Sequence, residues 1–215
     1  MNSRESEARM TKKRTPRNKD VQGFEYIESE SILHGLRDEY SLSREEHYIL
    51  YSFYVEHSMY GDQSNRKRTF MDYGWDSNET TKNGAKEALC KVLPLYGNDD
   101  FGFEEDDELG TYLAATSLSH DAVHDLSKER GVFSISGEKR NESYFILVFS
   151  RIRNCLAHGD FALRYNSQEK MVIMENHYNG YIKARFILRL ETILSLAQTV
   201  DKTGVLRINP NQAGE

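Results

Sequence analysis

The sequence has little cysteine, little proline and no excess of basic residues. Its 215 residues include 2 cysteines and 3 prolines. Cys90 and Cys155 are too few for a disulfide framework and are typical of a reducing compartment. So few helix breakers over this length favour helical segments. With 28 basic and 34 acidic residues the formal net charge is −6, so we expect any contact with nucleic acid to be local.

The sequence also lacks three further signals: a membrane-spanning run, a secretory signal and a metal-ligand cluster. The longest apolar runs fall far short of the roughly 20 residues that cross a bilayer, and the N-terminal residues lack the apolar core of a signal peptide. We therefore expect a cytoplasmic protein that does not contact a membrane. No CxxC pair suggests zinc, and we expect no metal or cofactor. His120 and His124 are one helical turn apart, but a third ligand is missing nearby.

The composition divides the chain into three parts. Residues 1–20 are polar and basic, which predicts a disordered tail; the alternative is a basic arm that helps to hold RNA. Residues 21–200 are predicted to form one helical domain. Residues 201–215 are predicted to form a flexible C-terminal tail.

Apolar residues in the central part recur mostly at helical spacing. Ser43 and Glu46 form a capping box at the start of one helix, and Gly159 is placed to end another. The acidic run 98–108 lacks the ligand order of a calcium loop and is predicted to be an exposed loop. The predicted helices cover residues 43–60, 80–93, 109–130, 142–158 and 181–200.

The period of the pattern changes between residues 161 and 178. Phe161, Leu163 and Tyr165 alternate with neighbouring residues, and a turn-like segment precedes a second alternating run. This is typical of a β-hairpin. The hairpin would interrupt the helices just before the last one.

The stretch from Ser150 to Phe161, SRIRNCLAHGDF, carries the residues best suited to chemistry. Asn154 and His158 are four residues apart and share one face of a helix, whereas Arg153 and His158 are about 140° apart. A loosened helix end, or the same helix of a second copy, would bring Arg153 and His158 together. The alternative interpretation is a polar helix face with His158 as a C-terminal cap.

These three side-chain types suit cleavage of RNA by attack of a 2′-hydroxyl on the adjacent phosphate. Histidine titrates near neutral pH and can move the proton. Arginine offers a planar set of donors to phosphate oxygens, and asparagine can donate to phosphate or orient the histidine. The reaction needs no metal ion.

The run from Arg153 to His158 is similar to the R-N-x-x-x-H motif of the HEPN (higher eukaryotes and prokaryotes nucleotide-binding) superfamily. The longer run IRNCLAHGDF resembles prokaryotic plasmid- and defence-associated members. The resemblance implies an all-α bundle of four or five helices, here with a β-hairpin insertion before the last helix. It also implies a metal-independent endoribonuclease that leaves a 2′,3′-cyclic phosphate. Arg153 and His158 would be catalytic, with Asn154 auxiliary.

The resemblance also implies partners. Two copies would form a homodimer with the site at the interface, and RNA would be the substrate. A toxin or phage-defence role would bring an antitoxin or regulatory partner. Lys183 and Arg185, just after the hairpin, are candidate phosphate contacts or part of a solvated helix face. The alternative function is a non-catalytic HEPN module that binds nucleotides or proteins and dimerises.

Overall fold

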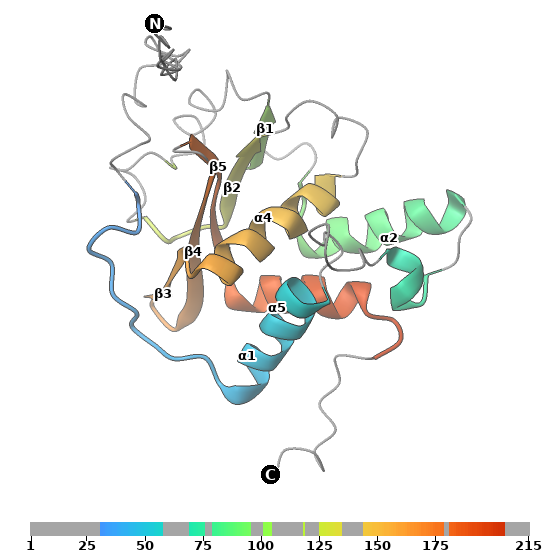
Figure 1. Cartoon of the computed structure of the whole chain (residues 1–215), viewed down its shortest axis with the longest axis horizontal. Coiled ribbons are helices and arrows are strands. Elements are labelled where there is room, and N and C mark those ends of the chain that lie inside the picture. Colours follow the sequence, from blue (N-terminus) through green and yellow to red (C-terminus); the bar gives the residue numbers. More distant parts are fainter. Residues whose placement is uncertain are drawn as a thin grey trace, which may run out of the picture.

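A five-stranded sheet with helices packed on one face forms the centre of the molecule (Figure 1). This computed structural model describes residues 31–57, 69–75, 79–95, 101–104, 118, 125–134, 144–178 and 181–204. The predicted all-α bundle is therefore wrong, because the sheet makes this a mixed α/β fold. The predicted tail 1–20 lies outside the described residues.

The strand order in the sheet is β1-β2-β5-β4-β3. β1 runs parallel to β2, and the other neighbouring strands are antiparallel. The hairpin predicted between residues 161 and 178 is confirmed as β3 and β4. The strands are β1 (Phe101–Glu104), β2 (Arg130–Ser134), β3 (Phe161–Asn166), β4 (Glu169–Tyr178) and β5 (Tyr181–Arg189).

Three of the predicted helices are confirmed within a few residues. The capping box is present: the Ser43 backbone N–H donates to Glu46 Oε2 over 2.7 Å, and the Glu46 N–H donates to Ser43 Oγ over 3.2 Å. The first helix changes to π-helical geometry in its second half. The helices are α1 (Arg44–Leu50), the π-helical Tyr51–Glu56, the 3-10 helix Phe70–Tyr73, α2 (Glu79–Val92), α4 (Tyr144–His158) and α5 (Leu190–Val200).

The predicted helix 181–200 is wrong in its first half, where the chain forms β5. β5 lies between β2 and β4, so apolar side chains cover both of its faces. Residues 184–188 are all buried. A strand that is buried on both faces loses the simple alternation that identifies a half-exposed strand. Its apolar residues could therefore be counted at helical spacing.

Two further predictions are corrected near the other end of the sheet. The predicted helix 109–130 is wrong at its end, because residues 125–129 are not helical and Arg130 begins β2. The acidic run 98–108, predicted to be an exposed loop, contributes Phe101–Glu104 to the sheet as β1. Phe101 is buried.

The two faces of the sheet pack against different partners. Side chains of β4 alternate between the faces, so Val172 and Met174 join the main core with the helices, whereas Met171 and Ile173 join a smaller core on the opposite face. From α4 the main core receives Phe145, Leu147, Val148, Phe149, Ile152 and Cys155. Since both faces are covered, a charged side chain on the central strands must find a partner in the interior.

The segment preceding α1 runs along the outer edge of β3 (Figure 1). The Glu39 N–H donates to the Leu163 carbonyl, and the Leu163 N–H donates to Asp38 Oδ1 over 2.8 Å. The Tyr165 N–H donates to Glu39 Oε2 over 2.8 Å. These bonds occupy backbone groups that an edge strand otherwise exposes.

The chain after α5 is fixed to the helical layer as far as residue 204. Trp75 Nε1 donates to the Val200 carbonyl over 2.8 Å, and Lys202 Nζ lies 3.4 Å from the centre of the Trp75 ring. This is a cation–π contact. The predicted flexible tail 201–215 therefore begins with packed residues, and residues 205–215 lie outside the described part.

Candidate active site at the end of helix α4

Helix α4 keeps regular geometry up to His158 and then stops abruptly. Gly159 has φ +74°, and the Asp160 N–H donates to the Cys155 carbonyl over 2.8 Å. This left-handed glycine with a six-to-one bond is a Schellman end, which closes the last helical turn. The helix end is therefore not loosened before His158. This leaves a second copy of the chain as the way by which Arg153 and His158 could meet.

The three motif side chains lie on the last turns of α4 but do not form one cluster within a chain. Arg153 Nη1 donates to Asn154 Oδ1 over 3.0 Å, and both residues are half-buried. His158 is exposed, and its ring makes no hydrogen bond or ion pair with any residue that the structure describes. At 100° per residue, Arg153 remains about 140° from His158 around the helix.

The Arg153 guanidinium is only partly satisfied. Its Nε is buried and has no hydrogen-bond partner among the described residues. A buried donor without a partner costs free energy, and an incoming acceptor would relieve that cost. Cys155, which lies between Asn154 and His158, is buried, and burial raises the pKa of its thiol well above the ordinary value. Cys155 is therefore a core residue and not a nucleophile.

Of the two predicted phosphate contacts, Arg185 has buried partners of its own. It lies on β5 with 1% of its surface exposed. Its Nε donates to Glu175 Oε2 over 2.6 Å, and its Nη1 donates to the Leu118 carbonyl over 2.9 Å. In this structure its charge is thus matched in the interior. Lys183, two residues earlier on the same strand, is half-buried.

Sequence reasoning missed a cluster of charged residues on β4 and β5, formed by Glu175, His177 and Arg185. Glu175 is fully buried, and its Oε2 also accepts the Ile32 N–H over 3.2 Å. His177 Nε2 bonds to Glu175 Oε1. A signal was present, because ionisable residues within a buried apolar strand imply partners on a neighbouring strand. The strand register, which pairs Glu175 with Arg185, was needed to identify those partners.

The pKa values of Glu175 and His177 are both shifted toward the charged forms. Burial opposes ionisation of Glu175, but the bond from His177 and the charge of Arg185 outweigh it and lower the pKa of the Glu175 carboxyl. The bond to Glu175 raises the pKa of His177, against the opposing effect of burial, and the Asp160 charge adds to the rise. The cluster is therefore an ion triad.

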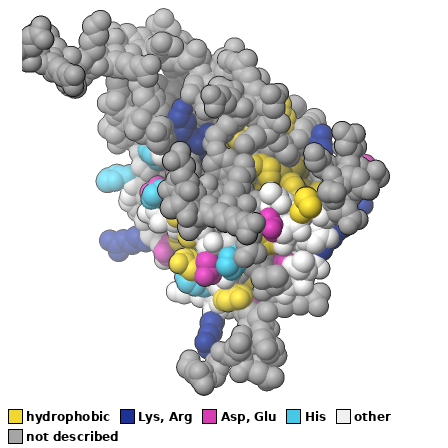
Figure 2. Space-filling view, turned by 45° about the vertical axis from the view of Figure 1, so that its right-hand side comes forward, with side chains coloured by type: hydrophobic (Ala, Val, Ile, Leu, Met, Phe, Trp, Pro, Cys, Tyr) yellow, Lys and Arg dark blue, Asp and Glu magenta, His cyan; other side chains and the backbone are white. Residues whose placement is uncertain are grey.

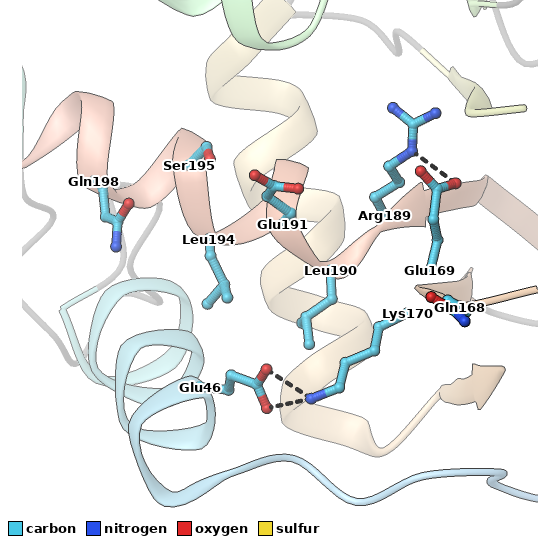
Figure 3. Close-up of a pocket in the computed structure, with 10 residues that line it drawn as sticks. All are labelled: Glu46, Gln168, Glu169, Lys170, Arg189, Leu190, Glu191, Leu194, Ser195 and Gln198. Carbon is cyan, nitrogen blue, oxygen red and sulfur yellow. Dashed lines mark hydrogen bonds and ion pairs between the residues drawn. The ribbon is translucent and has the colours of Figure 1, made fainter. Parts of the chain in front are cut away.

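A shallow groove of about 480 Å³ lies elsewhere, between α1, the β3–β4 turn and the start of α5 (Figure 3). Glu46 pairs with Lys170 and Glu169 with Arg189 along it. Leu194 contributes an apolar part of the lining. None of the three motif residues lines this groove, so it is separate from the end of α4.

The surface of the described part has no single dominant charge on the face shown in Figure 2, where basic, acidic and histidine side chains are interspersed. Among the residues that the structure describes, three metal-ligating side chains do not come together anywhere. His120 and His124 lie outside them. In that same part of the chain, every helix is too short or too polar to cross a bilayer.

Comparison of the chain with protein families, with curated proteins and with solved structures found no match. The resemblance to the HEPN superfamily therefore depends on the motif residues alone.

Proposed function

We propose that the protein is a metal-independent endoribonuclease of the toxin or phage-defence type, acting in the cytoplasm. One observation carries the proposal: the last turns of α4 present an arginine–asparagine pair and an exposed histidine that makes no bond to the described protein. The support is local chemistry, since the fold differs from the helical bundle that the resemblance implied.

The chemistry assigns a role to each side chain. His158 takes the proton of a 2′-hydroxyl, whose oxygen then attacks the adjacent phosphorus. The bond from phosphorus to the 5′ oxygen breaks and that oxygen takes up a proton from water, which leaves a 2′,3′-cyclic phosphate and a 5′-hydroxyl. Arg153 stabilises the charge that develops on the phosphate oxygens. Asn154 holds the Arg153 guanidinium through its Oδ1.

A second copy of the chain completes the site in this proposal. Arg153 and His158 are on different sides of a helix that stays regular to its end. In a two-fold dimer, Arg153 of one copy can face His158 of the other. The unsatisfied Nε of Arg153 is consistent with an acceptor arriving from outside the chain.

The direct test is cleavage of tRNA and of a structured RNA in EDTA. We expect His158→Gln to lower the rate by about 10² to 10⁴-fold, as removal of a general base does. His34→Gln is the matched control, because His34 is exposed in the segment before α1. Cleavage that is unchanged in His158→Gln removes His158 from the site.

A mixing experiment tests the shared site. Arg153→Met and His158→Gln should each be inactive, but a heterodimer of the two contains one intact site. Random pairing should then restore about a quarter of the wild-type activity. No restoration, with subunit exchange verified by mass, would show that each chain acts alone. A stable dimer without RNA cleavage would instead favour the non-catalytic nucleotide- or protein-binding module.

A further inference from the structure

The outward side of helix α1 carries aromatic residues where a surface helix usually carries polar and charged ones. The side that faces the core is formed by Ile49 and Leu50, which are buried. On the opposite side, Tyr48 and Tyr51 leave 42% and 53% of their surfaces exposed. The core does not need these two rings, which leaves them available for contact with another molecule.

Helical geometry places an arginine and a histidine beside the two tyrosines. At 100° per residue, four exposed side chains fall within a sector of about 100° around α1: Arg44, His47, Tyr48 and Tyr51. We call these four residues the tyrosine face. The two glutamates of the helix, Glu45 and Glu46, lie outside the sector, and Glu46 is paired with Lys170. The face is therefore aromatic and basic, in a chain whose formal net charge is −6.

The rings of the tyrosine face are held in an arrangement that suits stacking. His47 and Tyr51 lie one turn apart and almost parallel, with 6.2 Å between the ring centres and 3° between the ring planes. The Tyr51 N–H donates to the His47 and Tyr48 carbonyls, so the backbone of all three residues is fixed by the helix. A ligand that stacks on these rings therefore has little side-chain order to impose.

This combination of side chains fits a single-stranded nucleic acid. Unpaired bases stack on tyrosine and histidine rings whatever their sequence, because every base has a flat face. Arginine donates to phosphate oxygens and can also stack on a base. A protein partner typically covers about 20–30 residues on each side, whereas two bases need no more than the rings of this face.

We propose that the tyrosine face of α1 binds an unpaired segment of the RNA that the end of α4 cleaves, an inference that rests on the proposed function. The tyrosine rings receive the faces of two bases, and Arg44 donates to a phosphate beside them. The π-helical segment that continues α1 packs on α4, with 5.6 Å between the ring centres of Phe53 and Phe149. The face and the cleavage residues thus belong to one layer of helices (Figure 1). The inference requires that one RNA reaches both, with no direct contact between them.

The test measures binding separately from cleavage. The probe is a fluorescein-labelled oligouridine of about 12 nucleotides, and its fluorescence anisotropy gives Kd for His158→Gln, the cleavage-deficient background. In that background we expect Tyr48→Ser with Tyr51→Ser to raise Kd by about 30-fold or more, because two stacking contacts are lost. The pair Tyr48→Phe with Tyr51→Phe keeps both rings and should stay within about threefold of the background.

Tyr165→Ser is the matched control, because Tyr165 is 41% exposed but lies on β3; its Kd should not change. Arg44→Met should reduce the slope of log Kd against log salt by about 0.7, the value for one phosphate contact on a single strand. A duplex of the same length should bind more weakly, since its bases are already stacked. Circular dichroism melts verify that the exposed substitutions leave the fold intact.

An unchanged Kd in the double serine variant overturns the inference and leaves cleavage by His158 standing. Loss of self-association in that variant, with Kd unchanged, assigns the tyrosine face to a second copy of the chain and also overturns it. An equal loss of affinity in the phenylalanine pair overturns the stacking contact. Binding that depends on the tyrosines, in a wild-type protein that cleaves no RNA, overturns the proposed function while the face remains an RNA-binding surface.

Discussion

Two histidines at one end of the sheet have opposite surroundings. His158 ends a helix, is exposed, and has no hydrogen-bond partner among the described residues. His177 lies on a buried strand and bonds to a carboxylate that is itself fully buried. The backbone of α4 alone positions His158. The ring of His177 is positioned through Glu175 by β4, by Arg185 of β5 and by the segment before α1.

The comparison separates effects on ligand binding from effects on stability. A side chain without protein partners can be changed at little cost to stability, and any effect of its loss must come through a ligand. A side chain within a buried ion triad contributes to stability and to positioning together. Substitutions at the two histidines and at their supports should therefore differ in size in a predictable order.

The largest effect is expected for Arg185→Met, which leaves Glu175 buried without its cation. We expect the free energy of unfolding to fall by about 3–5 kcal/mol in urea titrations. The double variant with Glu175→Met should recover most of this loss, since an apolar pair fills the same space. Arg164→Met is the control: its partner Glu39 is partly exposed, so we expect a loss below about 1 kcal/mol. Equal losses for the two arginines would contradict the buried triad.

The second effect concerns the turn that positions His158. Gly159 has φ +74° and open space around its Cβ position, so Gly159→Ala meets only backbone strain, about 1–2 kcal/mol. Gly84→Ala within α2 should have the opposite sign and stabilise by about 0.5–1 kcal/mol, because alanine favours helices. Thermal unfolding measures both changes. A neutral Gly159→Ala would mean that the end of α4 can relax.

The third effect depends on pH. The folded state raises the pKa of His177 above 6.5, so its charged bond to Glu175 stabilises the protein fully below pH 6.5. That stability is lost as pH rises through the folded-state value. His177→Gln should therefore be less stable than wild type by about 1 kcal/mol near pH 6, a modest value because the side chain is partly exposed. The difference should shrink toward pH 9 in urea titrations. A difference that grows with pH would reverse the assignment.

The smallest effect is expected at His158. His158→Gln should change the free energy of unfolding by less than about 0.5 kcal/mol, as surface substitutions usually do. A thermal melt beside wild type measures it. A clear loss would show that His158 has a structural partner, which would end the contrast between the two histidines.

Features with local signals could be predicted from the sequence. The capping box at Ser43 and the glycine stop at Gly159 depend on residues within one turn of each helix end. The alternation in the hairpin is equally local. The positions of Arg153, Asn154 and His158 on α4 followed from helical spacing.

Features that depend on strand register could not be predicted. β5 passes into α5 between Arg189 and Leu190 with no glycine or proline to mark the change, so its apolar residues were counted with the helix. Arg185 was interpreted as a surface cation because its partner, Glu175, is brought beside it by pairing of β4 with β5. The bond from His177 to Glu175 was hidden because burial of that carboxylate depends on the same pairing.

The segment before α1 has a consequence for how the chain is made. Its bonds span most of the sequence: the Ile32 N–H to Glu175 is 143 residues apart, and the Tyr40 hydroxyl to the Met171 carbonyl is 131 apart. Contacts between residues so far apart in the sequence slow folding, because the chain loses conformational entropy on closing the loop before the contacts stabilise it. During synthesis this segment must wait for β4 to emerge. Until then β3 lacks its neighbour β4, and its unpaired edge exposes the growing chain to aggregation.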